Sequence, residues 1–179
     1  AAKPAASRRT RVTAKASTKE SRQEQPGFGL LLPPTAVTEI AFHFNAPDKL
    51  GYVCRFARKA LRHGARIVVL GDGAALSRLS PRLWSVSATD FLAHAFESDG
   101  AQMLAASPVI LAEHLQDLPH CDVLVNLTPQ VPSGFERFER VVEIVSSGDE
   151  MDRQDARARW RDYAARGFSI VRHDLNLKG

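Results

Sequence analysis

Short apolar segments typical of strands alternate with amphipathic helical segments from residue 39 to residue 172 of this 179-residue chain. The clearest strand signal is Arg66–Leu70 (RIVVL), a continuous apolar run of the kind found in parallel sheets that are covered on both faces. Parallel strands need long crossover connections, and helices supply them. The alternation therefore predicts a single α/β domain of Rossmann-like type, with a doubly wound, mostly parallel sheet and helices on both faces.

Periodicity and turn residues place the individual elements. The expected strands are Glu39–Phe44, Arg66–Leu70, Pro108–Leu111, Asp122–Leu127 and Val141–Val145, with Phe168–Arg172 as an edge strand. The expected helices are one capped by Asp48 and running through His63, then Ala74–Leu79, a short Phe135–Phe138, and Asp149–Arg166. Gly64 and Gly167 end the two long helices. No apolar run approaches the ~20 residues of a membrane-spanning helix, so no membrane contact is expected.

Charge is distributed unevenly along the chain. Residues 1–37 carry seven basic and two acidic side chains, whereas the other 142 residues carry 17 basic and 18 acidic ones. The near-neutral body argues against a domain that grips DNA along a broad basic face. Residues 1–36 lack apolar periodicity and are predicted to be a disordered basic extension, followed by a domain at 37–179. This extension is either a basic arm that contacts phosphates or an over-extended start, with the natural protein beginning at Val37.

Cysteine and histidine usage predicts neither a disulfide nor a metal centre. Cys54 and Cys121 are far apart and outside any CxxC pattern, which indicates reduced thiols in a cytoplasmic protein. Cys54 lies on the apolar stripe of the first helix and is predicted to be a buried, inert thiol. Only the His120-Cys121-Asp122 run places potential ligands side by side, and it cannot complete a tetrahedral shell. No metal or other cofactor is expected.

The turn Gly71-Asp72-Gly73 follows an expected strand and resembles the start of a nucleotide-binding turn, where glycines let phosphate approach a helix N-terminus. The third glycine of that motif is absent, and no GxxxxGK[ST] sequence is present. An ordinary strand-to-helix turn is the favoured interpretation. A small nucleotide-binding α/β enzyme that uses this turn remains the alternative function.

The last helix carries a cationic and aromatic face. Arg157, Trp160 and Arg161 are spaced i, i+3, i+4, and Arg153 lies one turn earlier. Guanidinium groups bind carboxylates bidentately and the indole is a flat apolar platform, so this face suits a short acidic and aromatic peptide. An exposed helix with solvated arginines and a core-capping Trp160 fits the same pattern.

Aromatic side chains also gather in the segment between the second helix and the next strand. Trp84 follows that helix closely and is predicted to cover the core. For Phe91, a core position and an outward position that anchors a partner both remain open.

In their order along the chain, these segments resemble the chi subunit family of bacterial DNA polymerase III holoenzyme, over roughly residues 38–170. The resemblance rests on the strand EIAFHFN, the helix with Tyr52-Val53-Cys54, Arg66–Leu70, Leu83-Trp84 with Phe91 and His94, Asp122–Leu127, and the last helix with Gly167-Phe168.

The resemblance implies a non-catalytic accessory subunit of the clamp-loader assembly in DNA replication, which pairs with a psi subunit and contacts DNA mostly indirectly. It also implies binding of the acidic, Phe-ended C-terminal tail of single-stranded DNA-binding protein at Arg157, Trp160 and Arg161, beside Arg153. The family often has Tyr-Lys where Trp160-Arg161 stand here, which keeps an aromatic ring and a cation. Phe91 matches an aromatic on the family's surface for psi or a helicase-like partner.

Overall fold

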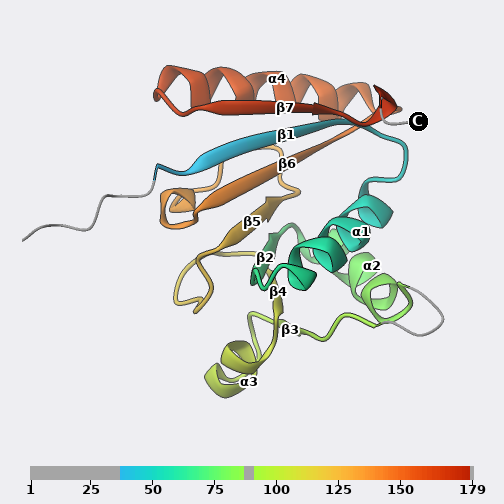
Figure 1. The fold of residues 1–179 in the computed structure, drawn as a ribbon, viewed down its shortest axis with the longest axis vertical. Helices are drawn as coiled ribbons and strands as arrows, with labels where there is room; N and C mark the ends of the chain where they lie inside the picture. The colour runs from blue at the N-terminus through green and yellow to red at the C-terminus, as the bar shows by residue number, and fades with distance from the viewer. Residues whose placement is uncertain (1–36, 87–90, 178–179) are drawn as a thin grey trace, which may run out of the picture. The chain divides into compact units, whose positions relative to one another are not determined.

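The computed structural model describes residues 37–86 and 91–177, so the predicted extension at residues 1–36 lies outside the described residues. In this part of the chain, strands in the order β3-β4-β2-β5-β6-β1-β7 form one seven-stranded sheet whose pairings are all parallel (Figure 1). The strands are β1 (Glu39–Ala46), β2 (Ile67–Leu70), β3 (His94–Phe96), β4 (Val109–Ala112), β5 (Val123–Asn126), β6 (Arg140–Ser146) and β7 (Ile170–Asp174). The helices are α1 (Lys49–Arg62), α2 (Gly73–Trp84), α3 (Ala101–Ala106) and α4 (Glu150–Ala165), with 3₁₀ turns at Phe135–Arg137 and Leu175–Leu177.

Alternate side chains of each strand enter two separate cores. In β2, Val68 and Leu70 join the core beneath α4, while Ile67 and Val69 join the core beneath α1 and α2. Figure 1 shows α1 and α2 next to each other and α4 running along β7. Helices on both faces of a parallel sheet confirm the predicted doubly wound α/β fold.

Helix α1 begins and ends where its sequence signals predict. The carboxylate of Asp48 accepts a hydrogen bond from the Gly51 backbone N–H at 3.1 Å and so caps the helix. This bond, together with the Arg82 guanidinium 2.8 Å away, holds the pKa of Asp48 below its ordinary value. At the other end Gly64 adopts a φ of +81°, which costs a glycine little.

Two elements are absent from the sequence prediction. Strand β3 has three residues and is held by its pairing with β4, so it is too short for a detectable alternation. Helix α3 has six residues, no side-chain cap, and Leu104 as its buried residue. Helix α2 is also longer than predicted and continues through Pro81 to Trp84, because Leu79 and Leu83 extend its buried stripe.

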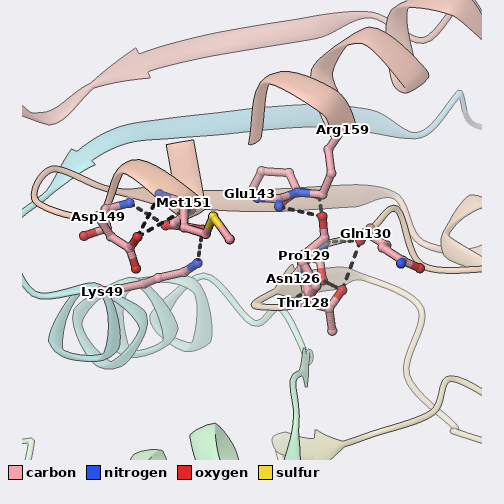
Figure 2. A network of polar contacts seen from close by, with 11 residues as sticks. Lys49, Asn126, Thr128, Pro129, Gln130, Glu143, Asp149, Met151 and Arg159 are labelled. Carbon is pink, nitrogen blue, oxygen red and sulfur yellow. Dashed lines mark hydrogen bonds and ion pairs between the residues drawn. The ribbon is translucent and has the colours of Figure 1, made fainter. Parts of the chain in front are cut away.

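A buried polar network fixes α4 on the sheet (Figure 2). Arg159 and Glu143 form an ion pair with 2.8 Å between Nε and Oε2, and both side chains are almost fully buried. The other carboxylate oxygen of Glu143 accepts hydrogen bonds from Asn126 at 2.9 Å and from the Tyr163 hydroxyl at 2.9 Å. Burial raises the pKa of Glu143, and the adjacent guanidinium opposes that rise. Arg159 also donates to the Pro129 carbonyl at 3.1 Å, so the helix is tied to the loop after β5.

The N-terminus of α4 is fixed separately. Asp149 caps the helix by accepting from the backbone N–H groups of Met151 and Asp152. The carboxylate of Asp152 accepts from Lys49 at 2.8 Å and from the Ser146 backbone N–H at 2.8 Å, which joins α4 to α1 and to the end of β6. Across residues 37–86 and 91–177, none of the helices has the combination of length and hydropathy needed to cross a bilayer.

Candidate functional site

The structure brings the predicted residues of the last helix together around one hollow. Arg157, Trp160 and Arg161 of α4 line a cavity of about 490 Å³, with Phe44 of β1 as a further wall. Arg153 lies beside an adjoining cavity of about 240 Å³ that shares Phe44 and Arg157. The two cavities together are called the α4 groove below. Its lining is an apolar floor with guanidinium groups around it.

Aromatic rings form the floor of the α4 groove. The ring centroid of Trp160 lies 5.0 Å from that of Phe42 and 6.1 Å from that of Phe44. Phe42 is fully buried, Phe44 and Trp160 are half-buried, and all three rings belong to the core beneath α4. Trp160 therefore packs against the core and also lines the groove, so its core-capping position is confirmed and its binding of a peptide stays a prediction. An apolar ring placed on this floor would extend an existing aromatic cluster.

Two of the arginines already converge on a carboxylate. Arg157 and Arg153 contact the two oxygens of Glu150 at 3.1 and 3.2 Å. Hydrogen bonds from Arg157 and then from Arg153 lower the pKa of Glu150. The pair shows that this surface can hold a carboxylate between two guanidinium groups. Arg161 is exposed and forms no ion pair with any other residue in the described part of the chain.

Phe44 and Arg172 are residues of the groove that sequence reasoning missed. The Arg172 guanidinium lies over the Phe44 ring, 5.1 Å from its centroid, and lines the smaller cavity together with Arg153. The alternation of β1 was a usable signal for Phe44, since residues two apart in a strand share a face. No local signal exists for Arg172, because its position depends on the pairing of β7 with β1.

The aromatic segment after α2 corrects one prediction. Trp84 does not cover the core: 54% of it is exposed, and its ring stacks on Phe91 at 5.5 Å between centroids. The reason is helical phase, because the lengthened α2 gives the core position to Leu83 and turns the next residue outward. Phe91 is 61% exposed, and the centroid of the His94 ring lies 5.2 Å from that of Trp84. The result is an exposed aromatic patch of Trp84, Phe91 and His94.

The features of the Gly71-Asp72-Gly73 turn do not suit a phosphate. The Asp72 side chain accepts from the Ala75 backbone N–H at 2.6 Å and so occupies the N-terminus of α2. Gly73 lies against the Glu113 carboxylate, because a Cβ at Gly73 would be 3.0 Å from its Oε1 atom. Two carboxylates at a helix N-terminus repel an anion.

Ligands of α/β proteins commonly bind at the carboxyl ends of the strands. A cavity of about 360 Å³ opens there beside β2, and Glu113 is one of its lining residues. None of the described residues that line it is lysine or arginine. The charge of this edge therefore also disfavours a nucleotide.

The two thiols and His120 differ in their exposure to solvent. Cys54 is buried, as predicted, and burial raises the pKa of its thiol, whereas Cys121 is exposed. His120 is buried and its Nε2 lies 2.7 Å from the Ser107 carbonyl oxygen. Within residues 37–86 and 91–177, no cluster of three or more histidine, cysteine or acidic residues is arranged to hold a metal ion.

Comparisons with known proteins identify the family to which this chain belongs. The model of the family described as "DNA polymerase III chi subunit, HolC" matches residues 37–171. The chain belongs to the DNA polymerase III chi subunit family. It is 34% identical to the DNA polymerase III subunit chi of Pseudomonas aeruginosa over 128 residues, which are 71% of this chain and 87% of that protein. It is 22% identical to the subunit of the same name from Haemophilus influenzae over 119 residues, which are 65% and 81% of the two chains.

Membership in the chi family makes this chain an accessory subunit of DNA polymerase III and a DNA replication protein. The matched range contains the described residues of the sheet through Val171, all of α4, and the exposed aromatic patch. Arg172, which lines the α4 groove, follows immediately after the match.

Proposed function

We propose that this chi family member is a non-catalytic adaptor that attaches the polymerase III clamp-loader assembly to single-stranded DNA-binding protein. The segment recognised is the acidic C-terminal tail of that protein, which ends in phenylalanine. The observation that carries the proposal is the α4 groove, where an aromatic floor and several guanidinium groups meet in one cavity. Such a surface matches a peptide whose carboxylates surround a terminal aromatic ring.

The arrangement suggests how the tail would lie. Its phenylalanine ring packs beside Trp160 and against Phe44, on the apolar floor of the 490 Å³ cavity. Its terminal carboxylate binds Arg161 and Arg157, which line the same cavity. Aspartate side chains further back along the peptide reach Arg153 and the guanidinium groups of the smaller cavity. The apolar contact and the ion pairs then come from neighbouring parts of one groove.

Glu150 is an internal competitor in this scheme. It holds Arg157 and Arg153 in the free protein, so an incoming carboxylate exchanges one ion pair for another. The net gain at these two arginines is therefore small, and Arg161 together with the aromatic floor supplies most of the affinity. A charge-assisted hydrogen bond contributes roughly 1.5–3 kcal/mol, and micromolar binding needs about 8 kcal/mol in total, so one tail must use both its carboxylates and its ring.

Tethering gains strength from repetition. Single-stranded DNA-binding protein on one stretch of DNA presents many tails, so a weak single contact becomes firm and reversible attachment. Because the contacts are ionic, the affinity for a tail should fall as salt concentration rises. The exposed patch of Trp84, Phe91 and His94 is the proposed surface for a second partner, either a psi subunit or a helicase-like protein. We place this activity in the cytoplasm, with DNA contacted mainly through these partners.

Calorimetric titration of the full chain with a short acidic peptide ending in Asp-Ile-Pro-Phe tests the proposal. We expect saturable micromolar binding that is lost in Trp160→Ala and Arg161→Ala and weakened in Arg157→Ala and Arg153→Ala. Arg78→Ala is the matched control, because Arg78 is an exposed arginine on α2, away from the groove.

The same peptide with an amidated C-terminus should bind more weakly, because Arg161 then loses a charged partner. Absence of binding to the folded wild-type protein, or equal loss in Arg78→Ala, would contradict the proposal. A thermal-shift screen with nucleotides tests the alternative class, since a bound nucleotide would raise the melting temperature.

A further inference from the structure

A second groove lies on the opposite face of the same sheet edge. Side chains of β1 and β7 alternate between the two faces, so Phe44 and Arg172 line the α4 groove. His43 and His173, which are register partners in the two strands, line a cavity of about 470 Å³ between this edge and α1. This cavity is called the α1 groove below.

The side of the α1 groove formed by α1 is strongly basic. Helix α1 has five basic residues and no acidic one over Lys49–Arg62. Arg55 and Lys59 are one turn apart, both are exposed, and both line the groove. Neither of them forms an ion pair with another described residue, whereas Lys49 is paired with Asp152. Near-neutrality of the whole body thus coexists with a local excess of positive charge at one helix.

The other walls add to this charge. His63 follows α1 and is exposed, and Arg140 at the start of β6 is paired with Glu39 at 2.9 Å. None of the described residues that line the groove is acidic. An anion inside it would therefore meet positive groups on several sides. Of the carboxylates nearby, Glu39 is paired with Arg140, and Asp48, which acts on Arg55, is paired with Arg82.

The floor of the α1 groove is aromatic. The His43 ring contacts those of Tyr52, Phe56 and His173 edge to face, with centroids 5.6, 5.7 and 4.7 Å apart. The His43 Nδ1 atom and the Tyr52 hydroxyl are 2.6 Å apart, which fixes both rings. The Arg55 guanidinium lies over the Tyr52 ring, 5.7 Å from its centroid. Planar rings and a guanidinium plane next to basic side chains are the elements with which proteins hold bases and phosphates of single strands.

We propose that the α1 groove binds single-stranded nucleic acid directly, with Arg55 and Lys59 on the phosphates and the aromatic floor against a base. An acidic peptide is a poorer match, because carboxylates would use the cations but not the row of rings. The proposal goes beyond tail binding and does not depend on it, since the two grooves share strands but no lining residue. The peptide tail and the single-stranded nucleic acid would then bind on opposite faces of the same sheet edge.

The test measures fluorescence anisotropy of a labelled oligothymidine of about 15 nucleotides, a length within the range that single-strand binding sites cover. The full chain is used, and Arg55→Gln/Lys59→Gln is compared with Arg78→Gln/Arg166→Gln. Both double variants remove two positive charges from exposed sites. Both also keep the basic residues at 1–36, so any binding of the oligonucleotide by those residues is the same in the two variants. We expect the groove variant to bind about tenfold more weakly than the control at low salt, and the slope of log K against log salt to fall by about 1.4, at about 0.7 per phosphate contact.

Local and competing probes complete the test. Oligothymidine should shift the imidazole resonances of His63 and His173 in NMR spectra, and Arg157→Ala/Arg161→Ala should bind it like the wild type. Equal loss in both charge variants would mean non-specific attraction and would overturn the proposal. So would displacement of the oligonucleotide by the acidic peptide, which would assign the groove to a peptide. Displacement of the oligonucleotide by inorganic phosphate, added at a concentration that carries a comparable total charge, would assign the α1 groove to a small anion. That result would also overturn the proposal.

Discussion

Replacing Arg159 by methionine tests whether the buried polar network holds α4, and with it the α4 groove, on the sheet. The substitution leaves the Glu143 carboxylate fully buried, with hydrogen bonds from Asn126 and Tyr163 but without its counter-ion. Removing one partner of a buried ion pair costs about 3–5 kcal/mol, because the remaining charge stays uncompensated. At roughly 3 °C per kcal/mol for a domain of this size, the melting temperature should fall by roughly 10 °C.

The variant should also acquire a distinct pH dependence. Burial raises the pKa of Glu143, and loss of the guanidinium removes the main opposing influence. Above the ordinary glutamate pKa of about 4.3, the Glu143 carboxyl of the unfolded chain has lost its proton, whereas in the folded Arg159→Met protein the same carboxyl still holds it. Its stability is therefore highest at acid pH and decreases as pH rises through the folded pKa.

Urea unfolding followed by tryptophan fluorescence measures both effects, because Trp160 packs on Phe42 and reports the docking of α4. Arg159→Met/Glu143→Gln keeps an acceptor for the two remaining donors without a buried charge, and it should regain about 1–3 kcal/mol. Arg166→Met, at the exposed end of the same helix, should change stability by less than about 1 kcal/mol. The reasoning is refuted if Arg159→Met loses under about 1 kcal/mol, if the double variant is no more stable than the single one, or if the single variant shows no pH dependence.

Three further predictions concern the surface and the thiols. Glu150→Gln should raise the affinity for the acidic peptide by roughly threefold in calorimetry, because it frees two arginines from an internal carboxylate; unchanged or weaker binding would contradict this role. Cys121 should react with a thiol reagent at the rate of an exposed cysteine while Cys54 reacts only on unfolding, since it is buried with a raised pKa; equal rates in the native protein would show otherwise. Trp84→Ser and Phe91→Ser should each alter the free energy of unfolding by less than about 1 kcal/mol, because both rings are more than half exposed, and a larger loss in urea titration would mean that they support the core.

Local sequence patterns determined much of this protein. The α/β class and the helix borders at Asp48 and Gly64 followed from periodicity and capping, which depend on residues three or four apart. The same spacing grouped Arg157, Trp160 and Arg161, and the structure places them around one cavity.

Other features depended on contacts between distant segments. Helix α4 has three arginines at alternate positions, and the sequence neighbourhood of Arg159 resembles that of Arg157 and Arg161. Its spacing from Ala156 and Tyr163 on the buried stripe was the available signal, but a buried arginine also requires a partner, and Glu143 comes from a different strand. Likewise, the outward position of Trp84 depended on how far α2 continued.

The two grooves show the same division. Sequence alternation alone separates Phe42 and Phe44 from His43 in β1, because successive side chains of a strand point to opposite faces. Only the tertiary structure places β7 beside β1 and so adds Arg172 to one face and His173 to the other. The physical reason is that helix and strand periods are set by neighbouring backbone bonds, whereas strand order is set by burial and crossover connections over the whole domain.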